Sequence, residues 1–274
     1  MTKPRQPIKA YDNRKFLHGD SARVLRIQTE YMEPDLRLQQ LGIKHTVIFF
    51  GSARIKPGGA RDWYGEAANL AEKIARWTNA THAPAERYHI CTGGGPGIME
   101  AVHVGAARVD VSLNIGLNIS LPFEQHLNPA VDVERAFEFH YFFMRKFWFV
   151  NLSAAAIIFP GGFGTLDELF ELLTLTQTGK SAAMPILLYG RKFWNRIINF
   201  KALVEEGLIS PEDLNSFVIV DSVEQAYAVI SKGLGSSHSE RARAARPAER
   251  ESKRDEQPHM TGIKPKKPAG SRKR

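Results

Sequence analysis

The chain has 274 residues, of which 43% are hydrophobic and 24% charged, and a formal net charge of +8. This length allows one α/β domain of about 200 residues with appendages, or two small domains, and the apolar content is sufficient for a core. The single cysteine, Cys91, excludes an internal disulfide framework and a zinc site built from cysteines.

The positive charge is concentrated at the carboxyl end. Residues 233–274 contain 12 Lys or Arg against 5 Asp or Glu, so the first 232 residues are almost neutral. This segment has no Phe, Trp or Tyr, and we expect a disordered basic tail that cannot form a core. A weak contact with nucleic acid is one role for such a tail, and a solvated segment without a specific role is the alternative.

The compartment is predicted from what the sequence lacks. The first 20 residues are charged and have no apolar stretch typical of a signal peptide, and no run approaches the roughly 18 apolar residues of a membrane span. Together with the lone cysteine, this predicts a cytoplasmic protein without membrane contact.

Apolar runs alternate with amphipathic segments along the chain. Residues 1–44 are polar, with a weak helical pattern at 21–41 that predicts an amino-terminal helical extension. Strands are predicted at 46–50, 88–92, 114–121, 154–159, 185–189 and 217–220. Helices are predicted at 63–77, 98–109, 135–150, from 164 onward, at 193–206 and at 223–232. This alternation predicts a single α/β domain at 45–232, with a doubly wound, Rossmann-like parallel sheet.

Three glycine-containing turns follow predicted strands. They are Gly51-Ser52, residues 93–97 (GGGPG) and residues 160–164 (PGGFG). Ligands of such sheets bind beyond the carboxyl ends of the strands, where these turns expose N–H groups to an anion, most often a phosphate. Arg54 is close enough in sequence to Ser52 to add positive charge there.

The third turn leads into the helix with the most informative carboxylate. We expect Thr165 to cap this helix, with Asp167 and Glu168 in its first turn. Leu172 and Leu175 lie four and seven residues beyond Glu168, so its carboxylate is expected to face apolar surface, which raises a pKa. The alternative is a surface carboxylate that interacts with the helix dipole.

Arg145 lies in an aromatic stretch of the predicted helix at 135–150. Its neighbours at helical spacing are Tyr141, Phe142, Trp148 and Phe149. A guanidinium in such surroundings is either stacked as part of the structure or directed at a buried anion or a base. Both alternatives remain open on the sequence alone.

Several familiar motifs are only apparent. Residues 95–100 (GPGIME) lack the third glycine of a dinucleotide fingerprint, and no acidic residue ends the next strand about 20 residues later, which disfavours NAD. Residues 179–181 (GKS) follow a helix instead of a strand and therefore are not a P-loop. The histidines show no metal-ligand spacing, so we expect no metal site.

Six apolar residues cover more than half of the helix that follows the third glycine turn. A helix so apolar is expected to be buried on both sides, which predicts a homodimer interface close to the site. A thicker monomeric core is the alternative. The six residues are Leu166, Leu169, Phe170, Leu172, Leu173 and Leu175.

These motifs together resemble one known family. Residues 160–168 (PGGFGTLDE) match the PGGxGTxxE signature of the LOG (Lonely guy) proteins, which are cytokinin riboside 5′-monophosphate phosphoribohydrolases and related bacterial nucleotide nucleosidases. Arg145-Lys146 matches the RK pair of the family, and the two earlier glycine turns match its turns in order. The resemblance covers about residues 45–232, and it implies dimers or larger homo-oligomers.

The resemblance implies hydrolysis of the N-glycosidic bond of a purine nucleoside 5′-monophosphate, with an N6-modified adenine as one candidate base. It makes Glu168 and Arg145 the catalytic pair and implies neither a metal nor an organic cofactor. A non-catalytic binder or carrier of a nucleotide or phosphorylated cofactor is the alternative on this fold. Family members are also labelled lysine decarboxylases, but no lysine here has a pyridoxal-binding context. The implied substrate- and phosphate-binding residues are Ser52, Gly94, Gly95, Lys146, Gly161, Gly162, Gly164 and Thr165.

Overall fold

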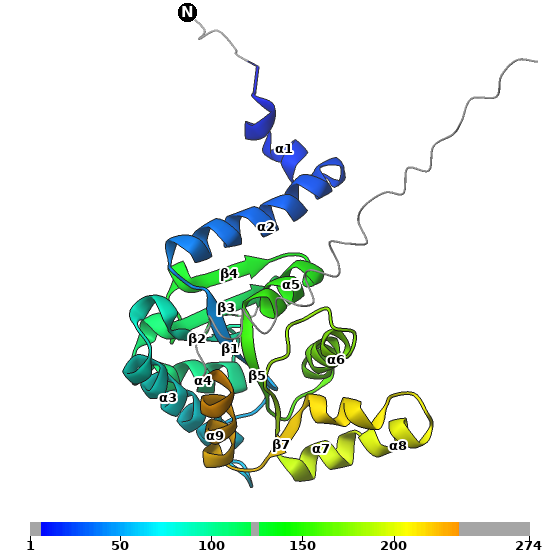
Figure 1. The fold of residues 1–274 in the computed structure, drawn as a ribbon. Helices are drawn as coiled ribbons and strands as arrows, with labels where there is room; N and C mark the ends of the chain where they lie inside the picture. Colours follow the sequence, from blue (N-terminus) through cyan, green and yellow to red (C-terminus); the bar gives the residue numbers. More distant parts are fainter. Residues whose placement is uncertain (1–6, 122–125, 236–274) are drawn as a thin grey trace, which may run out of the picture. The chain divides into compact units, whose positions relative to one another are not determined.

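The computed structural model describes residues 7–121 and 126–235, and they contain one seven-stranded parallel sheet (Figure 1). Its spatial order is β4-β3-β2-β1-β5-β6-β7, and every neighbouring pair is parallel. This confirms the predicted doubly wound α/β fold. The strands are β1 (His45–Phe50), β2 (Tyr88–Thr92), β3 (Asn114–Ile119), β4 (Ala136–Phe139), β5 (Ser153–Ile158), β6 (Ile186–Tyr189) and β7 (Val218–Val220).

Helices cover both faces of the sheet, which explains why β1, β2, β3, β5 and β6 are buried along nearly their whole length. One face packs against α3 (Trp63–Thr81), α4 (Ile98–Ala107) and α9 (Val223–Leu234). The other face packs against α2 (Arg23–Gln40), α5 (Phe142–Leu152), α6 (Phe163–Gln177) and α7 (Arg191–Ile197). The short helices α1 (Arg14–Leu17) and α8 (Phe200–Glu205) complete the set.

The order of the strands reverses between β1 and β5. The chain winds from β1 to β4 in one direction and returns at β5 to the other side of β1. The turns after these two strands are joined, because the amide of Ser52 donates to the carbonyl oxygen of Pro160 (3.0 Å). Such a switch point is where open parallel sheets bind ligands.

The predicted helix at 135–150 was wrong in its first part. Residues Ala136–Phe139 form the edge strand β4, and the helix α5 begins only at Phe142. Phe137 and Phe139 are buried whereas Glu138 is exposed, which is the period-two alternation of a strand. Aromatic residues favour strands as readily as they fill buried helices, so the change of period was the only available signal.

The predicted helix at 193–206 is also interrupted. Ile198 adopts an extended conformation between α7 and α8. The side chain of Asn199 then accepts a hydrogen bond from the amide of Ala202 (3.2 Å) and caps α8.

The helix after the third glycine turn starts earlier than predicted. Helix α6 begins at Phe163 and its N-cap residue is Gly162, so Thr165 is not the cap. Asp167 and Glu168 therefore lie in the second turn instead of the first.

By its contacts the chain divides into Met1–Gly235 and Ser236–Arg274, and the described residues all belong to the first unit. Most of the predicted disordered basic tail at 233–274 therefore lies outside the described residues, although Gly233 and Leu234 still belong to α9. None of the helices within residues 7–121 and 126–235 has the length and apolar character needed to cross a membrane.

Candidate functional site

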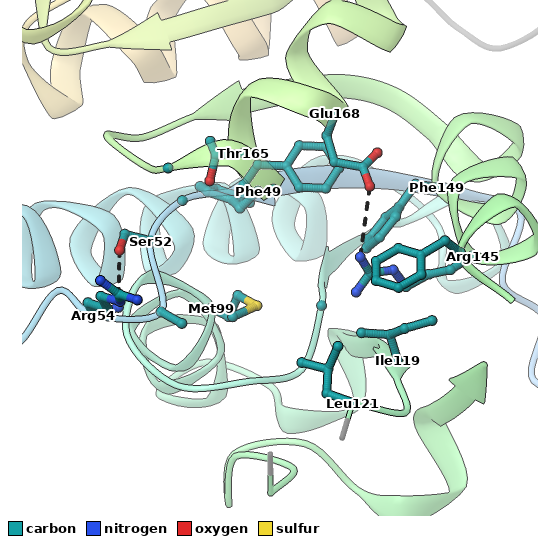
Figure 2. Close-up of a pocket in the computed structure, with 17 residues that line it drawn as sticks. Phe49, Ser52, Arg54, Met99, Ile119, Leu121, Arg145, Phe149, Thr165 and Glu168 are labelled. Atoms are coloured by element: carbon teal, nitrogen blue, oxygen red, sulfur yellow. Dashed lines mark hydrogen bonds and ion pairs between the residues drawn. The ribbon is translucent and has the colours of Figure 1, made fainter. Parts of the chain in front are cut away.

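A cavity of about 310 Å³ lies at the switch point of the sheet (Figure 2). It is formed by the end of β1 and the turn after it, the glycine turn after β2, the start of α4, the end of β3, one side of α5 and the amino-terminal half of α6. Its size is in the range of small-molecule sites. The lining residues are Phe49, Phe50, Gly51, Ser52, Ala53, Arg54, Gly93, Met99, Ile119, Leu121, Phe142, Arg145, Phe149, Gly162, Gly164, Thr165 and Glu168.

One end of the cavity has the properties of an anion site. Gly162, Gly164 and Thr165 bring the amino terminus of α6 into the cavity wall. The N–H groups of a first helical turn have no partners within the helix, and the helix dipole makes this end positive. Ser52 and Arg54 lie at the same end (Figure 2), and the Ser52 Oγ accepts a hydrogen bond from the Arg54 amide (3.1 Å).

Three glycines predicted to bind substrate do not line the cavity. A Cβ at Gly161 would collide with the side chain of Thr165, and one at Gly94, whose φ is +70°, would collide with Asn118. The carbonyl oxygens of Gly94 and Gly95 accept hydrogen bonds from the Asn128 side chain (2.9 and 3.1 Å). These glycines therefore help to form the turns at 93–97 and 160–164 without lining the cavity.

The other end of the cavity holds a buried ion pair. Arg145 on α5 and Glu168 on α6 face each other, with 4.0 Å between Nη2 and Oε1 (Figure 2). Glu168 is 4% exposed. The rings of Phe142 and Phe149 lie 5.4 and 5.7 Å from the Arg145 guanidinium. Within the described part of the chain, the buried Nε of Arg145 has no hydrogen-bond acceptor, so the guanidinium retains a free donor.

Burial raises the pKa of Glu168 to about 7, although the charges of Arg145 and Lys146 act in the opposite direction. This confirms the raised pKa expected from the sequence. Burial likewise lowers the pKa of Arg145, opposed by the charge of Glu168. A carboxylate with a pKa near 7 can accept a proton effectively at neutral pH, which is the property of a general base.

Lys146 was predicted to bind substrate, but the structure does not bring it to the cavity. Its Nζ lies 2.9 Å from Asp167 and 3.2 Å from Glu171 on the outer side of α6. Burial lowers the pKa of Lys146, but hydrogen bonds to these two carboxylates outweigh burial, and the net shift is upward. Lys146 therefore joins α5 to α6, and these are the helices that carry Arg145 and Glu168.

Sequence reasoning missed part of the apolar wall. Met99, Ile119 and Leu121 line the cavity beside Arg145. Ile119 ends β3 and Leu121 follows it, so their position at the carboxyl end of a predicted parallel strand was an available signal.

Comparison with known proteins identifies relatives of similar length and of greater length. A family profile described as "Possible lysine decarboxylase" matches residues 99–230. The chain is 32% identical over 146 residues to the pyrimidine/purine nucleotide 5′-monophosphate nucleosidase of Escherichia coli K12. This match covers 47% of this chain but only 30% of the E. coli protein. It therefore spans less than a third of the E. coli relative.

Two plant relatives are covered more completely. The cytokinin riboside 5′-monophosphate phosphoribohydrolase LOG7 of Arabidopsis thaliana is 32% identical over 175 residues, covering 61% of this chain and 72% of that protein. The probable cytokinin riboside 5′-monophosphate phosphoribohydrolase LOGL3 of rice (Oryza sativa subsp. japonica) is 31% identical over 182 residues, covering 63% of this chain and 76% of that protein.

Among solved structures, the molybdenum cofactor binding protein of Rippkaea orientalis is 20% identical, covers 69% of this chain and 98% of its own, and has a TM-score of 0.46. This distant likeness does not bear on function. The plant relatives are decisive: with 31–32% identity over 72–76% of their length, the chain belongs to the LOG family.

Proposed function

We propose that the protein is a hydrolase that cleaves the N-glycosidic bond of a nucleoside 5′-monophosphate, releasing the free base and ribose 5-phosphate. The names of the E. coli and plant relatives support this class of reaction. The observation that carries the proposal is the cavity itself, in which an anion site at the start of α6 and the buried Arg145–Glu168 pair occupy opposite ends.

The anion site accounts for the monophosphate. The 5′-phosphate would accept hydrogen bonds from the first-turn amides of α6 and from the Thr165 hydroxyl, with Ser52 at its side. Arg54, at the same end, would add positive charge. The apolar wall of Met99, Ile119 and Leu121 would then contact the flat faces of the base, and the ribose would lie between the two ends.

The buried pair accounts for the chemistry. As the C1′–N bond breaks, its electron pair leaves with the base, and positive charge develops on the ribose. Ionised Glu168 would stabilise that charge and take one proton from the water that adds to C1′. The proton ends on the released base, directly or through solvent, so that one water is consumed per nucleotide. Arg145 would hold Glu168 in place and favour its ionised form.

A decarboxylase acting through a pyridoxal Schiff base has little support. Such chemistry requires an amine in the cavity. Among the described residues that line the cavity, the cationic side chains are Arg54 and Arg145, and none is a lysine. Lys146, the nearest in sequence, is engaged with two carboxylates on α6.

The first test is to offer the protein AMP, GMP, CMP and N6-isopentenyl-AMP, and to measure base release by chromatography together with nucleotide affinity by calorimetry. Release of base from at least one nucleotide supports the hydrolase, and the order of the rates defines the preferred base. Binding of nucleotide without release of base would contradict the hydrolase and favour the non-catalytic binder.

We also propose that the protein is a homodimer that associates through α5 and α6. These two helices are neighbours, since Lys146 joins them. Besides Phe142, which lines the cavity, four phenylalanines on them remain exposed in the single chain: Phe143 (51%), Phe147 (40%), Phe163 (92%) and Phe170 (41%). Exposed aromatic side chains on neighbouring helices are typical of association surfaces, and a second copy would cover them.

A further inference from the structure

Helix α5, which carries Arg145, has no capping side chain of its own. Its N-cap residue is Tyr141, whose side chain forms no cap hydrogen bond. The carboxylate of Glu30, on helix α2, instead holds the two residues that lead into α5. It accepts hydrogen bonds from the amides of His140 (2.9 Å) and Tyr141 (3.2 Å), residues that lie 110 and 111 positions further along the chain. A carboxylate there also interacts favourably with the helix dipole.

The segment that Glu30 holds is bonded directly to Arg145, and Glu30 also contacts α5 beyond Arg145. The carbonyl oxygen of Tyr141 accepts the hydrogen bond of the Arg145 amide (3.2 Å). Further along the helix, the indole Nε1 of Trp148 donates to the carbonyl oxygen of Glu30 (3.0 Å). A single residue of α2 is thus bonded to the two residues that lead into α5 and to Trp148 of α5, which lie on either side of Arg145 in the sequence.

Other residues of α2 hold the same segment. The Arg37 guanidinium donates to the carbonyl oxygen of Ala136 (3.0 Å) and lies 3.9 Å from the centre of the Phe137 ring. The ring of Tyr31 lies 5.6 Å from that of Phe147. Helix α2 therefore packs along β4 and α5 (Figure 1).

We propose that Glu30 is a positioning residue that fixes the start of α5 and thereby the location of Arg145 relative to Glu168. This inference rests on the function proposed above. The guanidinium of Arg145 makes a 4.0 Å ion pair with Glu168, and its Nε is unpaired within the described residues. Its placement consequently depends on the backbone of α5 and on the flanking rings. Displacements of about 1 Å in a catalytic group can cost a hundredfold in rate.

The test compares Glu30→Ala and Glu30→Gln with a matched control, Asp35→Ala. Asp35 is also on α2, and its carboxylate accepts a hydrogen bond from Gln39 of the same helix (2.9 Å). We expect Glu30→Ala to lower kcat for base release at least about tenfold. The affinity for ribose 5-phosphate should stay within about twofold, since the anion site is built on α6 and the turn after β1. Glu30→Gln retains one amide acceptor and should recover part of the rate, and Asp35→Ala should match the wild type.

Hydrogen exchange of peptides that cover residues 140–149 tests the structural step separately. Glu30→Ala should accelerate their exchange about tenfold or more, and Asp35→Ala should leave it unchanged. An active wild type with an equally active Glu30→Ala, or unchanged exchange in that variant, contradicts the inference alone. Equal losses in Asp35→Ala would also contradict it. A wild type that releases no base removes the proposed function, and the role of Glu30 with it.

Discussion

The ionised form of Glu168 is unfavourable for folding because its carboxylate is buried. The same burial gives the carboxylate a pKa that suits a general base. Burial raises its pKa to about 7, and the Arg145 charge offsets only part of this effect. A carboxylate placed in this way is ionised at a cost to stability when the pH is above neutral. Functional sites commonly show such a conflict between stability and activity.

The conflict predicts a pH-dependent difference in stability between the wild type and Glu168→Gln. The folded-state pKa of about 7 is above the ordinary 4.5, so the stability that protonated Glu168 contributes is present below pH 4.5 and is lost as the pH rises through 7. Glutamine does not titrate. The free energy of unfolding of the wild type should therefore fall relative to Glu168→Gln by about 2–3 kcal/mol between pH 5 and pH 8.5.

Urea unfolding at the two pH values measures this difference. Glu134→Gln, at an exposed glutamate in the segment before β4, is the control for the loss of a carboxylate. A pH-independent difference for Glu168→Gln would show that this carboxylate is not held in an unfavourable charged state.

Substitutions of the two arginines that line the cavity should alter different kinetic constants. Arg145→Lys replaces a planar fork flanked by two rings with a point charge, and we expect kcat to fall about a hundredfold. Arg54→Ala removes a charge at the anion end, and we expect KM to rise about five- to tenfold with kcat nearly unchanged. Steady-state kinetics of base release give both values. The reverse assignment, with KM altered by Arg145→Lys and kcat by Arg54→Ala, would contradict the proposed orientation of the nucleotide.

At the scale of one element, α6 brings both ends of the site together. Its first turn lines the anion end, and Glu168 one turn later faces Arg145. Gly164 is part of that first turn, and a Cβ at this position would meet no atom within 4 Å. The position is glycine even though it is helical, where glycine is unfavourable compared with alanine. A glycine at this position leaves open space at the cavity lining.

Gly164→Ala should consequently weaken binding without lowering stability. We expect stability to stay constant or to rise by up to about 1 kcal/mol, because alanine favours a helix. The affinity for ribose 5-phosphate should fall about tenfold, since the methyl group occupies space beside the phosphate. Thermal unfolding and calorimetry measure the two effects.

Gly161→Ala is the contrasting variant, because its methyl group would collide with Thr165 and should lower stability directly. Unchanged affinity in Gly164→Ala would place the phosphate elsewhere.

The elements of the site differed in how well the sequence predicted them. The glycine turns and the burial of Glu168 followed from local patterns, namely a glycine run after an apolar strand and leucines at helical spacing. The edge strand β4 did not follow from a local pattern. It has only four residues, and aromatic residues suit both strands and helices. The pairing of Lys146 with Asp167 and Glu171 depends on how α5 packs against α6, which no local pattern contains.

For the whole molecule, the exposed phenylalanines of α5 and α6 make association testable. If these helices form the dimer interface, Phe147→Asp combined with Phe170→Asp should give a monomer, because charges cannot be buried there without partners. Light scattering after size-exclusion chromatography measures the mass. Phe16→Asp, at an exposed residue of α1, is the control and should keep the dimer. A monomeric wild type would contradict the proposed interface and favour a role for these residues within one chain.

Long-range contacts account for most of what the sequence left undetermined. Met99 of α4, Ile119 of β3 and Phe149 of α5 are far apart in the sequence, and the packing of helices on the sheet brings them to one cavity. The contact of Glu30 with the start of α5 spans about 110 residues. Nothing in residues 21–41 alone predicts that contact, because a glutamate on an amphipathic helix usually faces solvent.

The proposal that Glu168 serves the hydrolysis of a nucleotide is tested most directly by comparing base release by the wild type and Glu168→Gln at pH 7.5, with nucleotide affinity measured in parallel. We expect the wild type to release base and ribose 5-phosphate in equal amounts. Glu168→Gln should be at least about a hundredfold slower while binding the nucleotide with similar affinity. A Glu168→Gln variant as fast as the wild type would contradict the role of this carboxylate, and a wild type that binds nucleotide but never releases base would contradict the hydrolase itself.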